Sequence, residues 1–380
     1  DKAREYMEKI EQECYLYMEE TDELFFLIYQ TNLYHAEEKF HQRDICIERI
    51  RKHTLDQFAV MDVFDELYEY NHEGFTKIIW HGGEPTLIKY SLLDEIMKDQ
   101  ANKGHDNVVW SMQSNGTLLT QSYIDVLKEN KVSVGISLDG LREQHDRYRR
   151  FKNGNPTFDV IINNIHRLQE NGVRCGTLIT ITDNNVDYLL EIYEFFADLD
   201  VSFNFNALFP DKKENTPRLN VKEYSKKICD LFDKWISDEE HHIVISPFMH
   251  IIEGLLKPER GIPACHWSKD CSKSFTAIDI HGNLYPCEHW VGMKEYSFGN
   301  ITNGLEKELK NNTFFENRKQ KLQDTDCAGC KIWEFCYGGC PWNGWTIFGD
   351  IDRKDASVCE GRKIIIEHIK QYLLSHGKLN

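Results

Sequence analysis

The sequence predicts an α/β protein made of an open or partial (β/α)6 barrel and a following cysteine-rich domain. From residue 23 to residue 220, short apolar runs alternate with helix-like stretches, as they do in repeated strand–helix units. From residue 265 to residue 365 the composition changes. Eight of the chain's 12 cysteines fall in this region, among short predicted turns rich in glycine and tryptophan. Residues 221–264 are expected to form a helical bridge between the two regions.

The elements follow from these patterns in chain order. Apolar residues recur at helical spacing over residues 1–22, which predicts an N-terminal helix. Barrel strands are expected at 24–30, 76–82, 107–114, 132–139, 174–181 and 201–209, with helices at 91–103, 122–131 and 157–172 among them. The strands are apolar on both faces, as buried parallel strands are. Residues 366–380 are expected to be a C-terminal tail.

Composition excludes several functional classes. The net charge of −17 does not suit nucleic-acid binding, which needs clustered Lys and Arg. No run of about 18 apolar residues predicts a transmembrane helix, and the charged first 20 residues do not resemble a signal peptide. We therefore expect a cytoplasmic protein that binds neither nucleic acid nor membrane.

Polar, glycine-rich stretches follow the predicted strands at residues 31–38, 81–85, 114–117, 137–140 and 181–185. Parallel α/β folds bind their ligands at the carboxyl ends of the strands, so these loops are the candidate site. Each stretch taken alone is equally consistent with plain turn chemistry.

The spacing of the eight clustered cysteines predicts metal centres. Each [4Fe–4S] cluster takes four thiolates, so eight make two complete sets. Structural zinc sites use similar short spacings and are the alternative. A tight run of four cysteines with distant partners favours two [4Fe–4S] clusters. The pattern is Cys265-x5-Cys271, then Cys287, then Cys327-x2-Cys330-x5-Cys336-x3-Cys340, then Cys359.

This cysteine-rich part resembles the SPASM extension of radical S-adenosylmethionine (SAM) enzymes, which carries seven cysteines in this order. Cys265 matches an eighth cysteine of relatives such as the anaerobic sulfatase-maturating enzymes. The resemblance implies two auxiliary clusters. Cluster I would be held by Cys265, Cys271, Cys287 and Cys340, and cluster II by Cys327, Cys330, Cys336 and Cys359.

The N-terminal half resembles the radical SAM core, through 80-WHGGEPTL-87, 114-SNGTLL-119 and 135-GISLDG-140. The resemblance implies that Gly82, Gly83 and Glu84 meet the methionine amino group of SAM. It also implies that Ser137 and Arg149 hold the SAM carboxylate, which hydroxyl and guanidinium donors suit.

A candidate general base is Glu288, directly after a cluster I cysteine, where sulfatase-maturating relatives carry Asp. A partly desolvated carboxylate beside a cluster can accept a proton. An ordinary surface acid is the alternative at this position.

The loop 29-YQTNLYHAEEKF-40 departs from the family at the centre of its chemistry. Radical SAM enzymes bind their active cluster with CxxxCxxC after the first strand, but the matching positions here are Thr31, His35 and Glu38. No CxxxCxxC occurs anywhere in the 380 residues. Because such a cluster needs soft thiolate ligands, neither a third cluster nor reductive cleavage of SAM is expected.

Three functions remain open on this sequence. The favoured one is a radical SAM/SPASM-like iron–sulfur protein that acts on or binds a peptide or protein, as a partner subunit, a peptide-binding module or an electron conduit. An intact radical SAM enzyme is a candidate partner. The second is an enzyme with a mononuclear metal on His35 and Glu38, completed by His81 or Glu84, although ordinary loop residues are the simpler interpretation. The third is an active peptide-modifying oxidoreductase or maturase. Whether SAM binds is also open.

Overall fold

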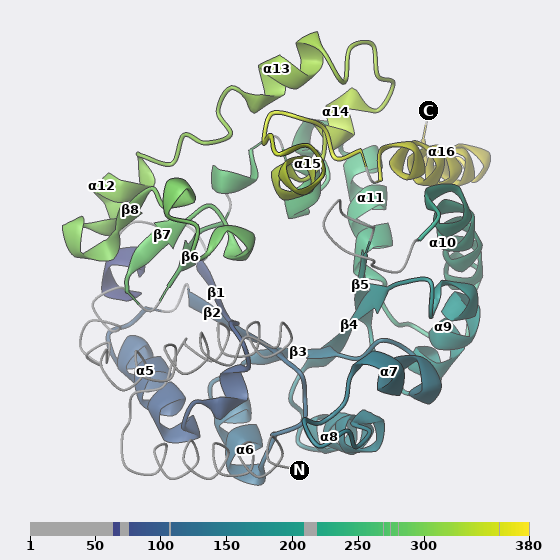
Figure 1. Ribbon diagram of the computed structural model, residues 1–380. Helices are drawn as coiled ribbons and strands as arrows, with labels where there is room; N and C mark the ends of the chain where they lie inside the picture. The colour runs from purple at the N-terminus through teal and green to yellow at the C-terminus, as the bar shows by residue number, and fades with distance from the viewer. Residues whose placement is uncertain are drawn as a thin grey trace. The chain divides into compact units, whose positions relative to one another are not determined.

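The computed structural model (Figure 1) describes residues 64–68, 76–105, 108–208 and 219–379, except residues 269, 274, 280 and 357. The predicted N-terminal helix, the first predicted strand and the loop with Thr31, His35 and Glu38 lie outside the described residues. The chain divides into two compact units of interleaved segments. The first comprises residues 1–137, 149–175 and 278–311, and the second comprises residues 138–148, 176–277 and 312–380.

Five parallel strands form a curled half-barrel sheet in the order β1-β2-β3-β4-β5, which confirms the predicted fold class. Each strand lies within a predicted strand. The apolar runs mark its buried middle, and the polar residues at the ends of the predicted range belong to loops. The strands are β1 (Thr76–Trp80), β2 (Val108–Ser114), β3 (Ser133–Ser137), β4 (Cys175–Ile181) and β5 (Phe203–Ala207).

The first unit builds its core between β1–β3 and the helices that connect them. Helices α5 (Tyr90–Asn102) and α6 (Gln121–Glu129) pack against each other, and their apolar faces are buried. Trp80 of β1 stacks on Trp110 of β2 with ring centroids 5.9 Å apart. Thr120 begins α6 by accepting a hydrogen bond from the Tyr123 amide at 3.3 Å, as N-cap threonines do.

The second unit contains a helical layer around α10 (Val221–Ile236). Helix α16 (Cys359–Ser375) packs along α10, where Phe232 meets the ring of Tyr372 edge-on at 5.4 Å. Helix α11 (Ser246–Leu256) joins them through Phe248, whose ring lies 5.3 Å from that of Phe232. Helix α16 continues to Ser375 and so runs across the expected start of a tail at residue 366.

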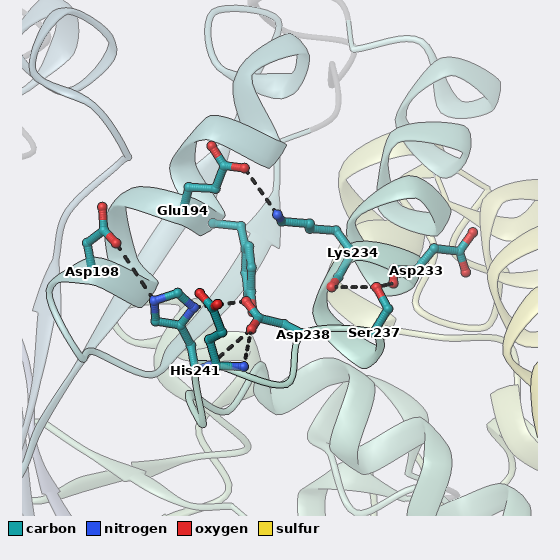
Figure 2. Close-up of polar contacts among 9 residues, drawn as sticks. Glu194, Asp198, Asp233, Lys234, Ser237, Asp238 and His241 are labelled. Carbon is teal, nitrogen blue, oxygen red and sulfur yellow. Dashed lines mark hydrogen bonds and ion pairs between the residues drawn. The ribbon is translucent and has the colours of Figure 1, made fainter.

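Asp238 pins the loop that follows α10 (Figure 2). Its carboxylate accepts hydrogen bonds from the hydroxyl of Tyr193 on α9 (Leu189–Asp198) at 2.8 Å and from the amides of Glu240 and His241 at 2.9 and 3.0 Å. These donors, the His241 amide first, hold the pKa of Asp238 below its ordinary value. The imidazole of His241 lies between Asp238 and Asp198, 3.0 and 3.8 Å away.

The cysteine-rich region is made of short elements joined by turns. Its small sheet consists of β6 (Ala277–Ile278), β7 (Asn283–Tyr285) and β8 (Gly299–Asn300). Among the helices of the described residues, none has both the length and the apolar character needed to cross a bilayer. The remaining helices are α7 (Arg142–Tyr148), α8 (Phe158–Glu170), α12 (Leu305–Leu309), α13 (Arg318–Asp324), α14 (Trp333–Cys336) and α15 (Pro341–Phe348).

Candidate functional site: strand ends and a cysteine-rich region

The loop after β1 is fixed by Glu84, which is only 6% exposed. Its Oε1 accepts hydrogen bonds from the Thr86 amide at 3.0 Å, the Thr86 hydroxyl at 2.6 Å and the Ser114 hydroxyl at 2.7 Å. Its Oε2 accepts from the Asn115 amide at 2.7 Å. Glu84 therefore ties the end of β1 to the end of β2, and Oε2 keeps capacity for one further donor.

The backbone before Glu84 needs glycine. Gly82 has φ 89°, a left-handed conformation that a side chain would strain, and its amide donates to Nδ1 of His81 at 2.9 Å. The tight turn brings the Gly82–Gly83 backbone to the carboxyl end of β1. The structure thus gathers Gly82, Gly83 and Glu84 at the strand edge where the sequence predicted a ligand.

The residues predicted to hold the SAM carboxylate also belong to the first unit. Ser137 is the last residue of β3 and accepts a hydrogen bond from the Gln113 side chain at 3.3 Å. Gly135 leaves room for that amide, since a Cβ there would lie 2.2 Å from Gln113 Oε1. The carbonyl of Arg149 accepts from the Thr157 hydroxyl at 2.8 Å, which fixes its backbone. Their role toward SAM stays a prediction.

Seven of the eight predicted cluster cysteines lie in the second unit, and Cys287 lies in the first. Burial raises the pKa of Cys327 to about 11, and the nearby thiols of Cys336, Cys330 and Cys359 add to the shift. These are the four cysteines assigned to cluster II. Cys330, Cys336 and Cys359 therefore lie near Cys327.

Three of the four cysteines assigned to cluster I are gathered in the same way. Burial raises the pKa of Cys271 to about 12, with further contributions from Cys340 and Cys265. In the described residues, no three His, Cys, Asp or Glu side chains are placed to hold one metal ion. A four-iron cluster spreads its thiolates around a cube, so its ligands stand further apart than those of a single ion.

The residues around these cysteines fit an anionic metal cluster. The donors are soft thiols in turns that need left-handed backbone at Tyr337, Gly338 and Gly339, with φ of 47°, 83° and 75°. Buried thiols with raised pKa values lose their protons when a metal binds. The local chain supplies positive charge for the resulting thiolates.

That positive charge comes from two buried arginines that the sequence did not single out. Arg318, on α13, is 5% exposed and donates to the carbonyls of Ile351 at 2.7 Å and Arg353 at 3.0 Å. Arg362, on α16, is 7% exposed and lies 3.5 Å from the sulfur of Cys336. A lone arginine in a helix carries no spacing signature that marks it as a neighbour of a metal site. For Arg362, a usable signal was its position three residues after Cys359, the last cysteine.

The candidate base Glu288 is placed at the surface. It opens a short 3-10 turn (Glu288–Trp290) right after Cys287, and its side chain is 61% exposed. The imidazole of His289 lies 3.8 Å from its carboxylate. Desolvation of this carboxylate would therefore have to come from a bound partner.

Comparison with known proteins shows which families this chain resembles. A model of the radical SAM superfamily matches residues 45–196, and a model of SPASM, an iron–sulfur cluster-binding domain, matches residues 270–331. A cysteine-type anaerobic sulfatase-maturating enzyme of Clostridium novyi is 31% identical over 343 residues, covering 85% of this chain and 88% of that protein. A serine-type anaerobic sulfatase-maturating enzyme of Bacteroides thetaiotaomicron is 25% identical over 347 residues, covering 85% and 82%.

The fold agrees with a solved structure. The structure of native anSMEcpe with bound AdoMet and Cp18Cys peptide matches with a TM-score of 0.71 and 27% identity, covering 80% of this chain and 85% of that chain. Strand order, strand-end motifs, cysteine spacing and these relatives all agree. The chain belongs to the radical SAM superfamily, in the group with a SPASM iron–sulfur domain that includes the anaerobic sulfatase-maturating enzymes.

Proposed function

We propose that this chain is a radical SAM/SPASM-type iron–sulfur protein that holds two auxiliary [4Fe–4S] clusters, binds a peptide or protein, and does not cleave SAM reductively. One observation carries the proposal. The chain keeps all eight auxiliary-cluster cysteines but has Thr31, His35 and Glu38 where the family has the three thiolates of its active cluster.

The two auxiliary clusters rest on the cysteine sets. Cluster I is assigned to Cys265, Cys271, Cys287 and Cys340, and cluster II to Cys327, Cys330, Cys336 and Cys359. Thiols that influence one another, turning backbone and buried guanidinium groups support this assignment. Zinc on the same thiolates is the outcome that metal analysis separates.

The loss of SAM cleavage rests on ligand chemistry. Hydroxyl, imidazole and carboxylate groups are poor substitutes for three thiolates around a [4Fe–4S] cluster. The superfamily match begins only at residue 45, after this loop. Without the active cluster, SAM would not be bound to the iron that normally passes it an electron, so the radical step does not start.

Binding of SAM is a separate part of the proposal. The Gly82–Glu84 turn, Ser137 and Arg149 would hold the amino and carboxylate groups of its methionine part. Support comes from the rigid loop around Glu84 and the remaining acceptor capacity of Oε2. A chain that binds SAM without cleaving it would use SAM as a structural ligand.

The peptide or protein partner is proposed from the relatives. One similar structure contains a bound peptide, and the similar curated proteins are sulfatase-maturating enzymes. An intact radical SAM enzyme is a further candidate partner, because it would supply the radical chemistry that this chain lacks.

One anaerobic preparation tests the proposal in two assays. Iron and sulfide analysis should give about eight irons per chain, four for each cluster, with zinc absent. Dithionite and SAM should then give 5′-deoxyadenosine only at the level of a control without protein. Zinc as the main metal would refute the clusters, and clear formation of 5′-deoxyadenosine would show an active radical SAM enzyme instead.

A further inference from the structure

Arg362 occupies an unusual position for a cation. It lies in the first turn of α16, three residues after Cys359, and is 7% exposed. Its Nη1 is 3.5 Å from Cys336 Sγ, and its Nη2 is 3.3 Å from a carboxylate oxygen of Asp355. The guanidinium also stacks over the ring of Trp267, 4.8 Å from the ring centroid. Every face of this charge is therefore in contact with protein.

The backbone is shaped to admit the guanidinium. Gly339 lies between Cys336 and Cys340, and a Cβ at this glycine would be 2.0 Å from Arg362 Nη1. The same Cβ would be 2.8 Å from Cβ of Asp355. The guanidinium thus rests against the short segment that joins a cysteine assigned to cluster II with one assigned to cluster I.

The formal charges of the described residues around Arg362 do not sum to zero. Asp355 is 1% exposed and interacts with both Arg362 and Arg318. The guanidinium of Arg318 is met by backbone carbonyls, which carry no net charge. Two buried cations therefore share one buried carboxylate, and an uncompensated buried charge is costly. A cluster with four thiolates is an anion that would supply the balance.

We propose that Arg362 sets the reduction potential of the cluster bound by Cys336, as a hydrogen-bond donor to that sulfur and as a fixed positive charge. The inference rests on the proposed assignment of these cysteines to a cluster. Hydrogen bonds to cluster sulfurs and the net charge nearby are two of the factors that set such potentials.

The electron balance gives the sign of the effect. An external low-potential donor, dithionite in the test, gives one electron to the cluster, and no bond is formed or broken. The reduced cluster carries one more negative charge than the oxidised one. The positive charge of Arg362 stabilises the reduced form more, so it raises the potential. Asp355 acts on the same site with the opposite sign.

The test is a potentiometric titration of the full, iron-loaded chain, followed by electron paramagnetic resonance. With Arg362→Gln, the ratio of reduced to oxidised cluster at a fixed potential should fall about tenfold, equal to about 59 mV for a one-electron couple. Asp355→Asn should shift the ratio in the opposite direction. Arg362→Lys, which keeps the charge, should give a smaller fall than Arg362→Gln.

The matched control is Lys370→Gln, which removes the same charge from an exposed position of α16 and should leave the ratio unchanged. A purely structural role for Arg362 predicts shifts of the same sign for Arg362→Gln and Asp355→Asn, and that result would overturn the proposal. If Arg362→Gln loses iron, Arg362→Lys and Asp355→Asn still decide the sign.

Failure of the cluster assignment is distinguishable from failure of this inference. A wild-type chain without iron would refute the assignment and the role of Arg362 together. A wild-type chain with its iron, and with the same potential in Arg362→Gln as in Lys370→Gln, would refute the role of Arg362 alone.

Discussion

The strand-end loop and the cysteine-rich region both bury charge, but they balance it differently. At the strand end, the carboxylate of Glu84 is met by four hydrogen bonds from the chain itself. In the cysteine-rich region, the buried guanidiniums of Arg318 and Arg362 share one buried carboxylate, that of Asp355. The hydrogen bonds of the first site come from the polypeptide alone, whereas the second keeps an excess of positive charge that the proposed cluster would balance.

This difference indicates which part of the molecule should depend on a cofactor for its stability. A satisfied buried carboxylate holds its loop whether or not a ligand is present. A buried excess of positive charge opposes folding until the neighbouring cysteines lose their protons and bind metal. We therefore expect stability to be intrinsic near β1 and β2 and cofactor-dependent near α15 and α16.

Removing the clusters should produce the largest effect. Chelation of iron under oxidising conditions would leave Arg318 and Arg362 with Asp355 as their shared counter-charge. The free energy of local opening should then fall by roughly 4 kcal/mol, the cost of an uncompensated buried charge. Hydrogen exchange measured by mass spectrometry should then become about a thousandfold faster in peptides of α15 and the first turn of α16.

The internal control for that experiment is the strand-end loop. Exchange in peptides covering β1 and β2 should stay within about threefold of the loaded protein, because Glu84 has its partners in both states. Equal acceleration in both regions would contradict the comparison.

Replacing Glu84 should give the next largest effect. Glu84→Ala leaves the Thr86 and Asn115 amides and the Ser114 hydroxyl without their shared acceptor, and hydrogen bonds to a charged group are worth about 1.5–3 kcal/mol. The free energy of local opening, measured by hydrogen exchange in β1 and β2, should fall by roughly 3 kcal/mol. Glu84→Gln keeps one acceptor oxygen and should lose about half as much. An alanine variant as stable as wild type would show that the loop does not depend on this carboxylate.

The smallest expected effect is on stability, in a pair of glycine-to-alanine substitutions that separate the cost of a steric contact from the cost of backbone strain. Gly339→Ala would place a Cβ 2.0 Å from Arg362 Nη1, whereas the Cβ of Gly349→Ala meets nothing within 4 Å. Both positions have nearly the same φ, 75° and 74°, so the second variant measures the strain alone, about 1 kcal/mol. The first should cost about 1 kcal/mol more because the guanidinium must move. Thermal unfolding of both loaded variants measures the difference, and equal midpoints would mean that the guanidinium is not confined by Gly339.

The sequence predicted the five described barrel strands to within a few residues. Runs such as 174-RCGTLITI-181 leave little choice, since buried parallel strands are apolar on both faces. The roles inside the site were harder to predict. Glu84 was expected to face a ligand, but two of its four hydrogen bonds within the protein come from Ser114 and Asn115, 30 and 31 residues away in the chain. Such pairings depend on how β1 and β2 lie side by side, and so they join positions that are far apart in the sequence.

The buried arginines show the same limit more clearly. Arg362 sits in an ordinary amphipathic helical sequence, and its environment comes from Asp355, Trp267 and the turn at Gly339. Cysteine spacing reports the ligands of a metal directly, because short intervals are set by coordination geometry. Arg362 is close to Cys359 in the sequence, but its contact with Cys336 joins positions 26 residues apart and becomes visible only in three dimensions.

The interleaved segments of the two units have a consequence for protein synthesis. The first unit needs residues 278–311, and the second needs residues 312–380. Domains fold as units while the ribosome delivers the chain from its N-terminus. Neither unit can close when the barrel strands emerge, because each waits for a segment translated much later. The proposed cluster II takes Cys359 as a ligand, so it can be completed only after nearly the whole chain has been translated.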